Sequence, residues 1–415
     1  MRAAVFALLA LAAGAALAQE EDALSIADKA QLSAEQPRDL RLFVEGALRS
    51  SRQQSNGAAL HGERLSFDLR YDKTFAPGLR AVFADRLDMD RFGANVPGDG
   101  NINTLKEAYV SWQPAPDRIG DIGRVNVRNG VATGYNPTDY FRANAVRSVV
   151  SVDPASLREN RLGTGMVRGQ ALWENGSATA LFAPKLADQP TASPYSPDFG
   201  ATNSRNRWLV AASQKVSESL APQALLSGGA GQSTQLGFNV TSLLNDATVG
   251  FVEWSGGRSS SLAAQAGVKP GDEAFRSRLS TGLTYTTAGN LSLTAEYEYN
   301  GAAFRKGEWD AFRQGSPLLY GRYRTFVGNL QDLPTREAAF FYATWQDIFV
   351  KHLDLTGMLR YDVADHSRLQ WMELRYHWPR FDVALQAQYN SGAPTTNFGA
   401  LFERRALQVV VRYFL

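Results

Sequence analysis

The sequence contains no cysteine and only four histidines. The lack of cysteine excludes disulfide bonds, zinc–thiolate sites and thiol nucleophiles. No two histidines have the spacing of metal ligands, so we predict neither a metal site nor a bound cofactor. Positive and negative charges nearly cancel, with 43 Lys and Arg against 41 Asp and Glu. A nucleic-acid surface would be strongly basic, so nucleic acid is not an expected partner.

Long apolar runs are missing beyond the first twenty residues, so no transmembrane helix is predicted there. The exception is the opening segment, "MRAAVFALLALAAGAALAQE", which has a basic start at Arg2 and small residues at Ala16 and Ala18. This pattern is typical of a secretory signal peptide cleaved after Ala18. A membrane anchor is the alternative, but the run is short and alanine-rich and no stop-transfer charges follow it.

What the sequence does contain is alternation. In "FDVALQAQYN" (381–390) the residues Phe, Val, Leu, Ala and Tyr occupy one face, and mainly polar residues occupy the other. Segments such as "LDLTGMLRYD" and "LSLTAEYEYN" repeat the pattern over about ten residues, with aromatics near their ends. This is typical of strands that cross an outer membrane with lipid outside and water inside. A secreted soluble β-protein is the alternative.

We predict an all-β fold, a transmembrane antiparallel up-and-down β-barrel with short periplasmic turns and long outer loops. The expected count is eighteen strands, and it would be sixteen if one hairpin were misread. The glycine-rich segment 222–231 has the weakest strand pattern of the predicted segments. Eighteen strands are expected, at 40–52, 62–74, 78–89, 104–113, 118–128, 164–174, 177–184, 206–217, 222–231, 233–243, 247–256, 276–287, 290–300, 336–347, 352–362, 367–378, 380–391 and 404–415.

Three parts of the chain follow from this reading. Residues 1–18 are the predicted signal peptide, 19–39 a polar periplasmic extension, and 40–415 the barrel. The last segment, "RRALQVVVRYFL", is expected to close the barrel by pairing with the first strand, which would remove both sheet edges.

One region carries a family resemblance. The segments "LKEAYVSW" (105–112), "GRVNVRNG" (123–130) and "GYNPTDYF" (134–141) resemble a region of Gram-negative outer-membrane porin-like proteins. The alginate-export and hydrocarbon-porin-like groups are among them, and the match covers mainly 105–165. The resemblance implies an outer-membrane channel without chemistry of its own.

The loop 129–163 is the candidate constriction, because an ordered loop of this length is usually functional. It is the third outer loop, which in general porins folds into the barrel. Alternation within 118–128 is expected to point Arg124, Asn126 and Arg128 into the lumen. These arginines could form an anion filter or merely pair with acids of the wall, and both alternatives stay open. The candidate pore-lining residues are Arg124, Asn126, Arg128, Asp139, Arg142, Arg147, Asp153, Arg158, Glu159 and Arg161.

The predicted function is passive diffusion of small hydrophilic solutes, with anionic solutes as one option. Export of a polysaccharide or another polymer with periplasmic partners is the alternative. An enzyme is not expected, because no nucleophile elbow or phosphate-binding loop is present. The expected partners are the lipid bilayer, lipopolysaccharide, the solute and the outer-membrane assembly machinery. The sequence does not decide between a monomer and a trimer.

Overall fold

The computed structural model describes residues 39–91 and 100–415. The predicted signal peptide and nearly all of the predicted extension 19–39 therefore lie outside the described residues. The described chain from Asp39 to Leu415 forms one compact unit.

Eighteen strands make up most of this unit, and short helices lie in the long loops. The strands are β1 (Leu40–Gln53), β2 (Ala59–Ala76), β3 (Leu79–Arg91), β4 (Gly100–Ala115), β5 (Arg118–Val125), β6 (Thr164–Trp173), β7 (Gly176–Ala183), β8 (Arg207–Gln214), β9 (Leu220–Gly229), β10 (Gln232–Asn245), β11 (Thr248–Ser259), β12 (Ala274–Thr286), β13 (Leu291–Asn300), β14 (Glu337–Trp345), β15 (Leu353–Asp362), β16 (Arg368–His377), β17 (Phe381–Ser391) and β18 (Glu403–Phe414). The helices are α3 (Pro154–Glu159), α4 (Phe199–Thr202), α5 (Leu262–Gln265), α6 (Lys306–Phe312) and α7 (Pro317–Leu330).

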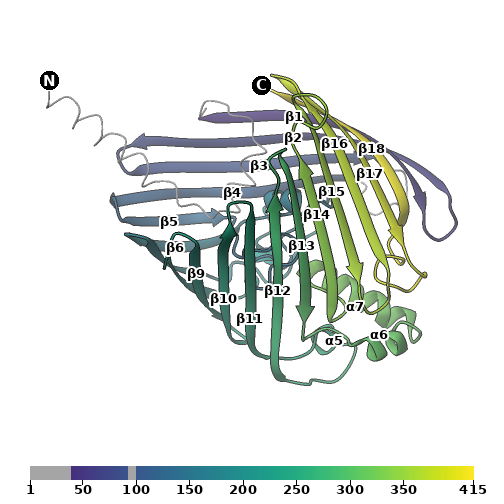
Figure 1. The fold of residues 1–415 in the computed structure, drawn as a ribbon. Helices are drawn as coiled ribbons and strands as arrows, with labels where there is room; N and C mark the ends of the chain where they lie inside the picture. Colours follow the sequence, from purple (N-terminus) through teal and green to yellow (C-terminus); the bar gives the residue numbers. More distant parts are fainter. Residues whose placement is uncertain (1–38, 92–99) are drawn as a thin grey trace, which may run out of the picture. The chain divides into compact units, whose positions relative to one another are not determined.

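The strands form a single closed antiparallel barrel (Figure 1). Each strand pairs with its neighbours in sequence, and β1 also pairs with β18, in a register that places Val44 opposite Tyr413 and Leu48 opposite Val409. The predicted closing strand and the strand count are confirmed, and the weakest predicted strand is present as β9. Several strand boundaries differ from the prediction by up to four residues. One of these differences changes the site: β5 ends at Val125, so Asn126 and Arg128 belong to the following loop.

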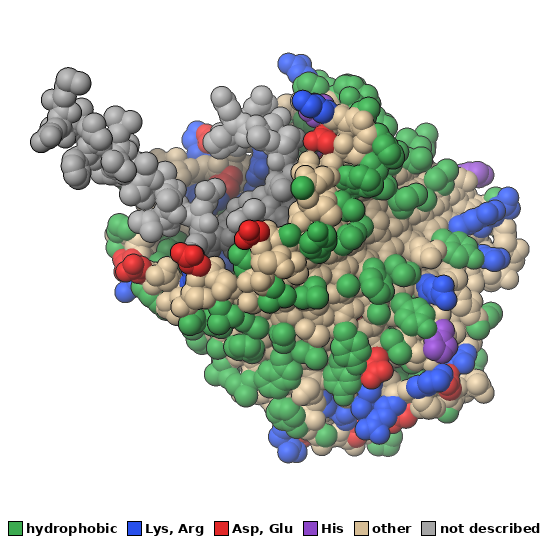
Figure 2. All heavy atoms as spheres, viewed as in Figure 1, with side chains coloured by type: hydrophobic (Ala, Val, Ile, Leu, Met, Phe, Trp, Pro, Cys, Tyr) green, Lys and Arg blue, Asp and Glu red, His purple; other side chains and the backbone are tan. Residues whose placement is uncertain are grey.

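The two faces of the wall differ as the alternation predicts. In β18, Leu407, Val409 and Val411 are exposed on the outside, whereas Gln408 and Val410 between them are buried on the inside. Apolar side chains cover much of the outer wall in view (Figure 2). A lipid-facing arginine at mid-membrane would cost about 2–4 kcal/mol, which explains why the charges lie on the inner face.

The long loops carry a hydrophobic core of their own. Leu262, Phe304, Trp309 and Tyr323 are buried together where α5, α6 and α7 meet. None of these helices was predicted from the sequence. Among the described residues, no helix is long and apolar enough to cross a membrane.

Candidate functional site

The loop 126–163, between β5 and β6, runs through the lumen. It contacts inward-facing side chains from separate parts of the wall. Arg64 of β2 donates to the Val150 carbonyl at 3.4 Å, and Arg360 of β15 donates to the Gly134 carbonyl at 3.1 Å. The loop also contacts Glu253 of β11. Since β2 and β11 are nine positions apart in the ring of eighteen strands, a loop that reaches both crosses the channel.

Glu253 of β11 is the main anchor of this loop. Its side chain is fully buried. One carboxylate oxygen accepts the backbone N–H groups of Val131, at 2.8 Å, and Ala132, at 3.1 Å. The other accepts the backbone N–H and the hydroxyl of Thr138, both at 2.8 Å. The Asn136 amide donates a fifth hydrogen bond at 3.3 Å. Five donors on one carboxylate fix the backbone of residues 131–138, since hydrogen bonds to charged groups are stronger than neutral ones.

Glu296 of β13 is the second anchor. It accepts the backbone N–H groups of Thr133, at 2.6 Å, and Gly134, at 2.9 Å. Gly130, at φ +102°, allows the close approach to the first anchor: a Cβ there would lie 2.6 Å from both oxygens of Glu253. Glycine is required at that position for both its backbone conformation and its lack of a side chain.

Arg142 and Tyr135 attach the loop to the segment that follows α7. The Tyr135 hydroxyl donates to Asp332 at 2.7 Å, and the Arg142 guanidinium lies 3.6 Å from the same carboxylate. Arg142 also donates to the Leu330 carbonyl at 3.3 Å. This candidate pore-lining arginine is therefore occupied in holding two loops together.

Arg161 and Asp139 form a buried ion pair within the loop, at 2.7 Å and with both side chains 2% exposed. Arg161 also donates to the Asn126 side chain at 2.7 Å and to the Val127 carbonyl. The three candidate residues Asn126, Asp139 and Arg161 thus lie together and stabilise the fold of the loop.

Arg147 and Asp153 connect the loop to other elements. Arg147 donates to the carbonyls of Asn103, at 2.8 Å, and Ser196, at 2.7 Å. Asp153 is the N-cap of α3, where it accepts the Ser156 N–H at 3.0 Å. Both residues were candidates for the constriction, and both make contacts that hold the loop in place.

Arg124 lies in a different environment from Arg128. Arg124 is buried, and its guanidinium lies 4.4 Å from the centre of the Phe199 ring at the start of α4. Arg128, beyond the end of β5, is exposed to the lumen. The structure does not place these two arginines on one strand face, because the strand alternation stops at Val125.

Solved structures with the same architecture are porins of Gram-negative outer membranes. OccK8 (OprE) of Pseudomonas aeruginosa superposes with a TM-score of 0.55 at 12% identity, covering 91% of this chain and 98% of that chain. OccAB1 of Acinetobacter baumannii gives 0.56 at 10% identity, covering 91% and 96%. A BenF-like porin of Pseudomonas fluorescens Pf-5 gives 0.56 at 9% identity, covering 91% and 98%.

This chain has the fold of an outer-membrane porin. No protein-family model matches its sequence, and no curated protein sequence matches it either. At about one residue in ten identical, the likeness to these porins shows the fold of this chain, a closed antiparallel barrel. The solutes that these porins carry are therefore not assigned to this chain.

In this porin-type barrel most wall arginines are paired with acids. Glu45 accepts from Arg64 and Arg86, each at 2.9 Å, and from Arg412 at 2.8 Å. This agrees with the alternative in which the arginines of the wall pair with its acids. Further wall pairs are Arg49 with Glu403, Arg70 with Glu107, and Arg375 with Glu373.

Among the five arginines of the loop 126–163, Arg128 and Arg158 differ from Arg142, Arg147 and Arg161, which each lie near a carboxylate. Within the part of the chain that the structure describes, neither forms an ion pair. Arg128 as a whole residue is exposed, but desolvation by the surrounding protein and the nearby charge of Arg161 lower its pKa. An arginine stays protonated even so. These two residues are the cations that remain available to a passing solute.

Glu159, at the end of α3, is an acid of the loop 126–163 and is exposed to the lumen. Burial in the barrel would raise its pKa, but the positive charges of Lys106, Arg412 and Arg128 outweigh this effect and lower it below the usual value of 4.5. Glu159 is therefore ionised at neutral pH. The described residues contain no cluster of His, Asp or Glu that could hold a metal ion.

Neither Glu253 nor Glu296 was predicted from the sequence to anchor the loop. Their inward positions could be read from the alternation. Their partners could not, since the anchors lie more than 110 positions away from the loop residues that they hold.

Proposed function

We propose that this porin-type barrel lets small hydrophilic solutes diffuse passively through a lumen narrowed by the loop 126–163, with a preference for anions. The observation that carries the proposal is the loop itself. It enters the barrel after β5 and is held across the channel by Glu253 and Glu296. A solute crossing the barrel would have to pass beside it.

The preference for anions rests on the charges that the loop leaves unpaired. Arg128 and Arg158 lack carboxylate partners in the described residues, whereas Glu159 is one acid facing several cations. A fixed positive excess at a narrow point concentrates anions, and guanidinium groups bind carboxylates and phosphates with two parallel hydrogen bonds. Small solutes bearing a carboxylate or phosphate fit this site best.

The alternative, export of a polymer, is less well supported. A polymer needs a continuous wide passage, and here the anchored loop occupies part of the lumen. The many buried contacts of the loop, including the Arg161–Asp139 pair, argue against easy displacement.

Conductance of the purified protein in planar bilayers tests the proposal. We expect discrete open-channel events and, across a salt gradient, a reversal potential of the sign for anion preference. An absence of channel events would refute the porin function. A reversal potential of the opposite sign would refute the preference for anions and leave the channel intact.

A further inference from the structure

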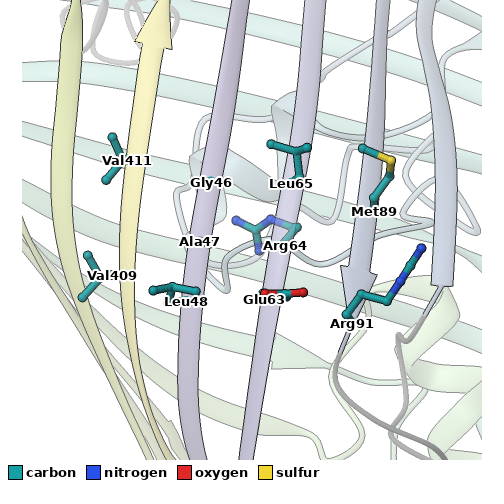
Figure 3. A pocket seen from close by; sticks show the side chains of 10 residues that line it. All are labelled: Gly46, Ala47, Leu48, Glu63, Arg64, Leu65, Met89, Arg91, Val409 and Val411. Carbon is teal, nitrogen blue, oxygen red and sulfur yellow. The ribbon is translucent and has the colours of Figure 1, made fainter.

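A shallow groove lies on the lipid-facing side of the wall, across β18, β1, β2 and β3. It is open at Gly46, which has no side chain and where a Cβ would meet no heavy atom within 4 Å. The outward-facing side chains that line it are mainly apolar, namely Leu48, Leu65, Met89, Val409 and Val411, and the charged Glu63 and Arg91 also line it (Figure 3). The groove has a volume of about 580 Å³.

The groove continues toward the outer loops. A second hollow of about 310 Å³ shares Leu48 and Val409 with the first and reaches Leu407 and His61. Both hollows lie in the half of the wall where β1 runs toward its outer turn. The two hollows together therefore form one mainly apolar groove on the surface that faces the outer leaflet.

Two arginines lie at the outer end of this groove. Arg52 and Arg405 are directly opposite each other on β1 and β18. Both are exposed, while their neighbours Ser51 and Ala406 are buried on the inner face, so both arginines belong to the outward face. Arg52 follows Leu48 by four residues, which places it about 13 Å farther along the strand.

This arginine pair has no carboxylate partner. Among the described residues Arg52 donates only to the Gly57 carbonyl, at 3.2 Å, and Arg405 forms no ion pair. Like charges directly opposite each other on neighbouring strands are unfavourable. An anion between them would remove the repulsion. Arg91, opposite Glu63, adds another guanidinium at the edge of the groove.

We propose that this surface binds lipid A, the phosphorylated and acylated glycolipid of the outer leaflet. One acyl chain would lie in the groove beside Gly46, and a phosphate would bind between Arg52 and Arg405. The charge complementarity selects the ligand, because guanidinium groups bind phosphate oxygens in pairs. The site faces away from the lumen, so the proposal is independent of the solute that the channel carries.

Native mass spectrometry of the detergent-purified protein with synthetic hexa-acyl diphosphoryl lipid A tests the site. We expect one lipid A to be retained per barrel, in preference to phosphatidylglycerol. Arg52→Gln with Arg405→Gln should weaken retention roughly twentyfold, since each arginine near an anionic headgroup contributes about fivefold. Gly46→Leu should weaken it independently by filling the groove.

Two variants serve as matched controls. Gly357 is another lipid-facing glycine whose Cβ would meet no atom within 4 Å, so Gly357→Leu should retain lipid A normally. Arg380→Gln removes an exposed arginine at the periplasmic end and should have no effect. Heat-dependent electrophoretic mobility confirms that each variant is folded. Unchanged retention in both the double-arginine and the Gly46→Leu variants, or equal retention of phosphatidylglycerol, would overturn the proposal.

Discussion

The carboxylate of Glu253 accepts two hydrogen bonds from Thr138, one from the backbone N–H and one from the hydroxyl, both at 2.8 Å. The two residues are 115 positions apart in the chain. This contact fixes the turn of a loop that leaves the wall at β5 and returns to it at β6. The constriction is thus defined by a strand residue on another part of the wall.

Replacing Glu253 by glutamine should loosen the loop. Glutamine has the same shape, but it provides one acceptor oxygen where the carboxylate provides two, and its amide faces the donors of the loop. We expect a loss of about 2–3 kcal/mol in the free energy of unfolding, measured with guanidinium in detergent. Single-channel recordings should show larger and noisier conductance. Glu218→Gln, at an exposed turn residue, is the control, and matching behaviour of the two variants would exclude the anchoring role.

The Arg161–Asp139 pair should contribute strongly to stability. Asp139→Asn leaves a buried guanidinium without its counter-charge, and breaking a buried pair costs about 3–5 kcal/mol. The exposed pair between Lys185 and Asp188 gives a comparison, because Lys185→Gln should cost less than about 1 kcal/mol. Equal unfolding midpoints for these two variants would contradict the buried pair shown by the structure.

Arg128→Gln should reduce the preference for anions. The substitution removes an unpaired positive charge from the lumen, so the reversal potential in a salt gradient should move toward that of a non-selective pore. Arg118→Gln removes an arginine that is 55% exposed at a periplasmic turn and paired with Asp117, and it should leave selectivity unchanged. An unaltered reversal potential in Arg128→Gln would assign Arg128 to the wall.

Glu159 should oppose the preference for anions at neutral pH. Its pKa lies below 4.5 because Lys106, Arg412 and Arg128 favour the ionised form over the opposing effect of burial. Glu159→Gln should therefore raise anion selectivity at pH 7. The difference from the wild type should persist at pH 5 and disappear only as the pH falls through the lowered pKa, where the wild type also becomes neutral. If the difference in anion selectivity between Glu159→Gln and the wild type vanished by pH 6, the lowered pKa of Glu159 would be contradicted.

The barrel could be predicted from the sequence because alternation is a local property. The stretch 404–415 shows its two faces within twelve residues, and its pairing with β1 follows from the need to close the sheet. The Ser316–Pro317 start of α7 is also a local signal: Ser316 accepts the Leu319 N–H as N-cap. The start of α7 is therefore a feature that the sequence itself indicates.

The arrangement of the loop could not be predicted in the same way. Extending strand alternation past Val125 wrongly grouped Arg124 with Arg128, and Arg124 is covered by Phe199, whose position depends on a different loop. Arg142, Arg147 and Arg161 looked like pore cations, but each is engaged by an acid or by carbonyls from distant segments. Such pairings depend on the three-dimensional path of the loop.

The central claim is that solutes pass beside the anchored loop, and the absence of cysteine makes a direct test possible. A single cysteine introduced as Arg128→Cys can be modified with a thiol-reactive sulfonate during single-channel recording. The account predicts a stepwise fall in conductance on modification, with no change in the cysteine-free parent or in Arg118→Cys. A modified Arg128→Cys channel with unchanged conductance would show that the conducting path does not pass the loop.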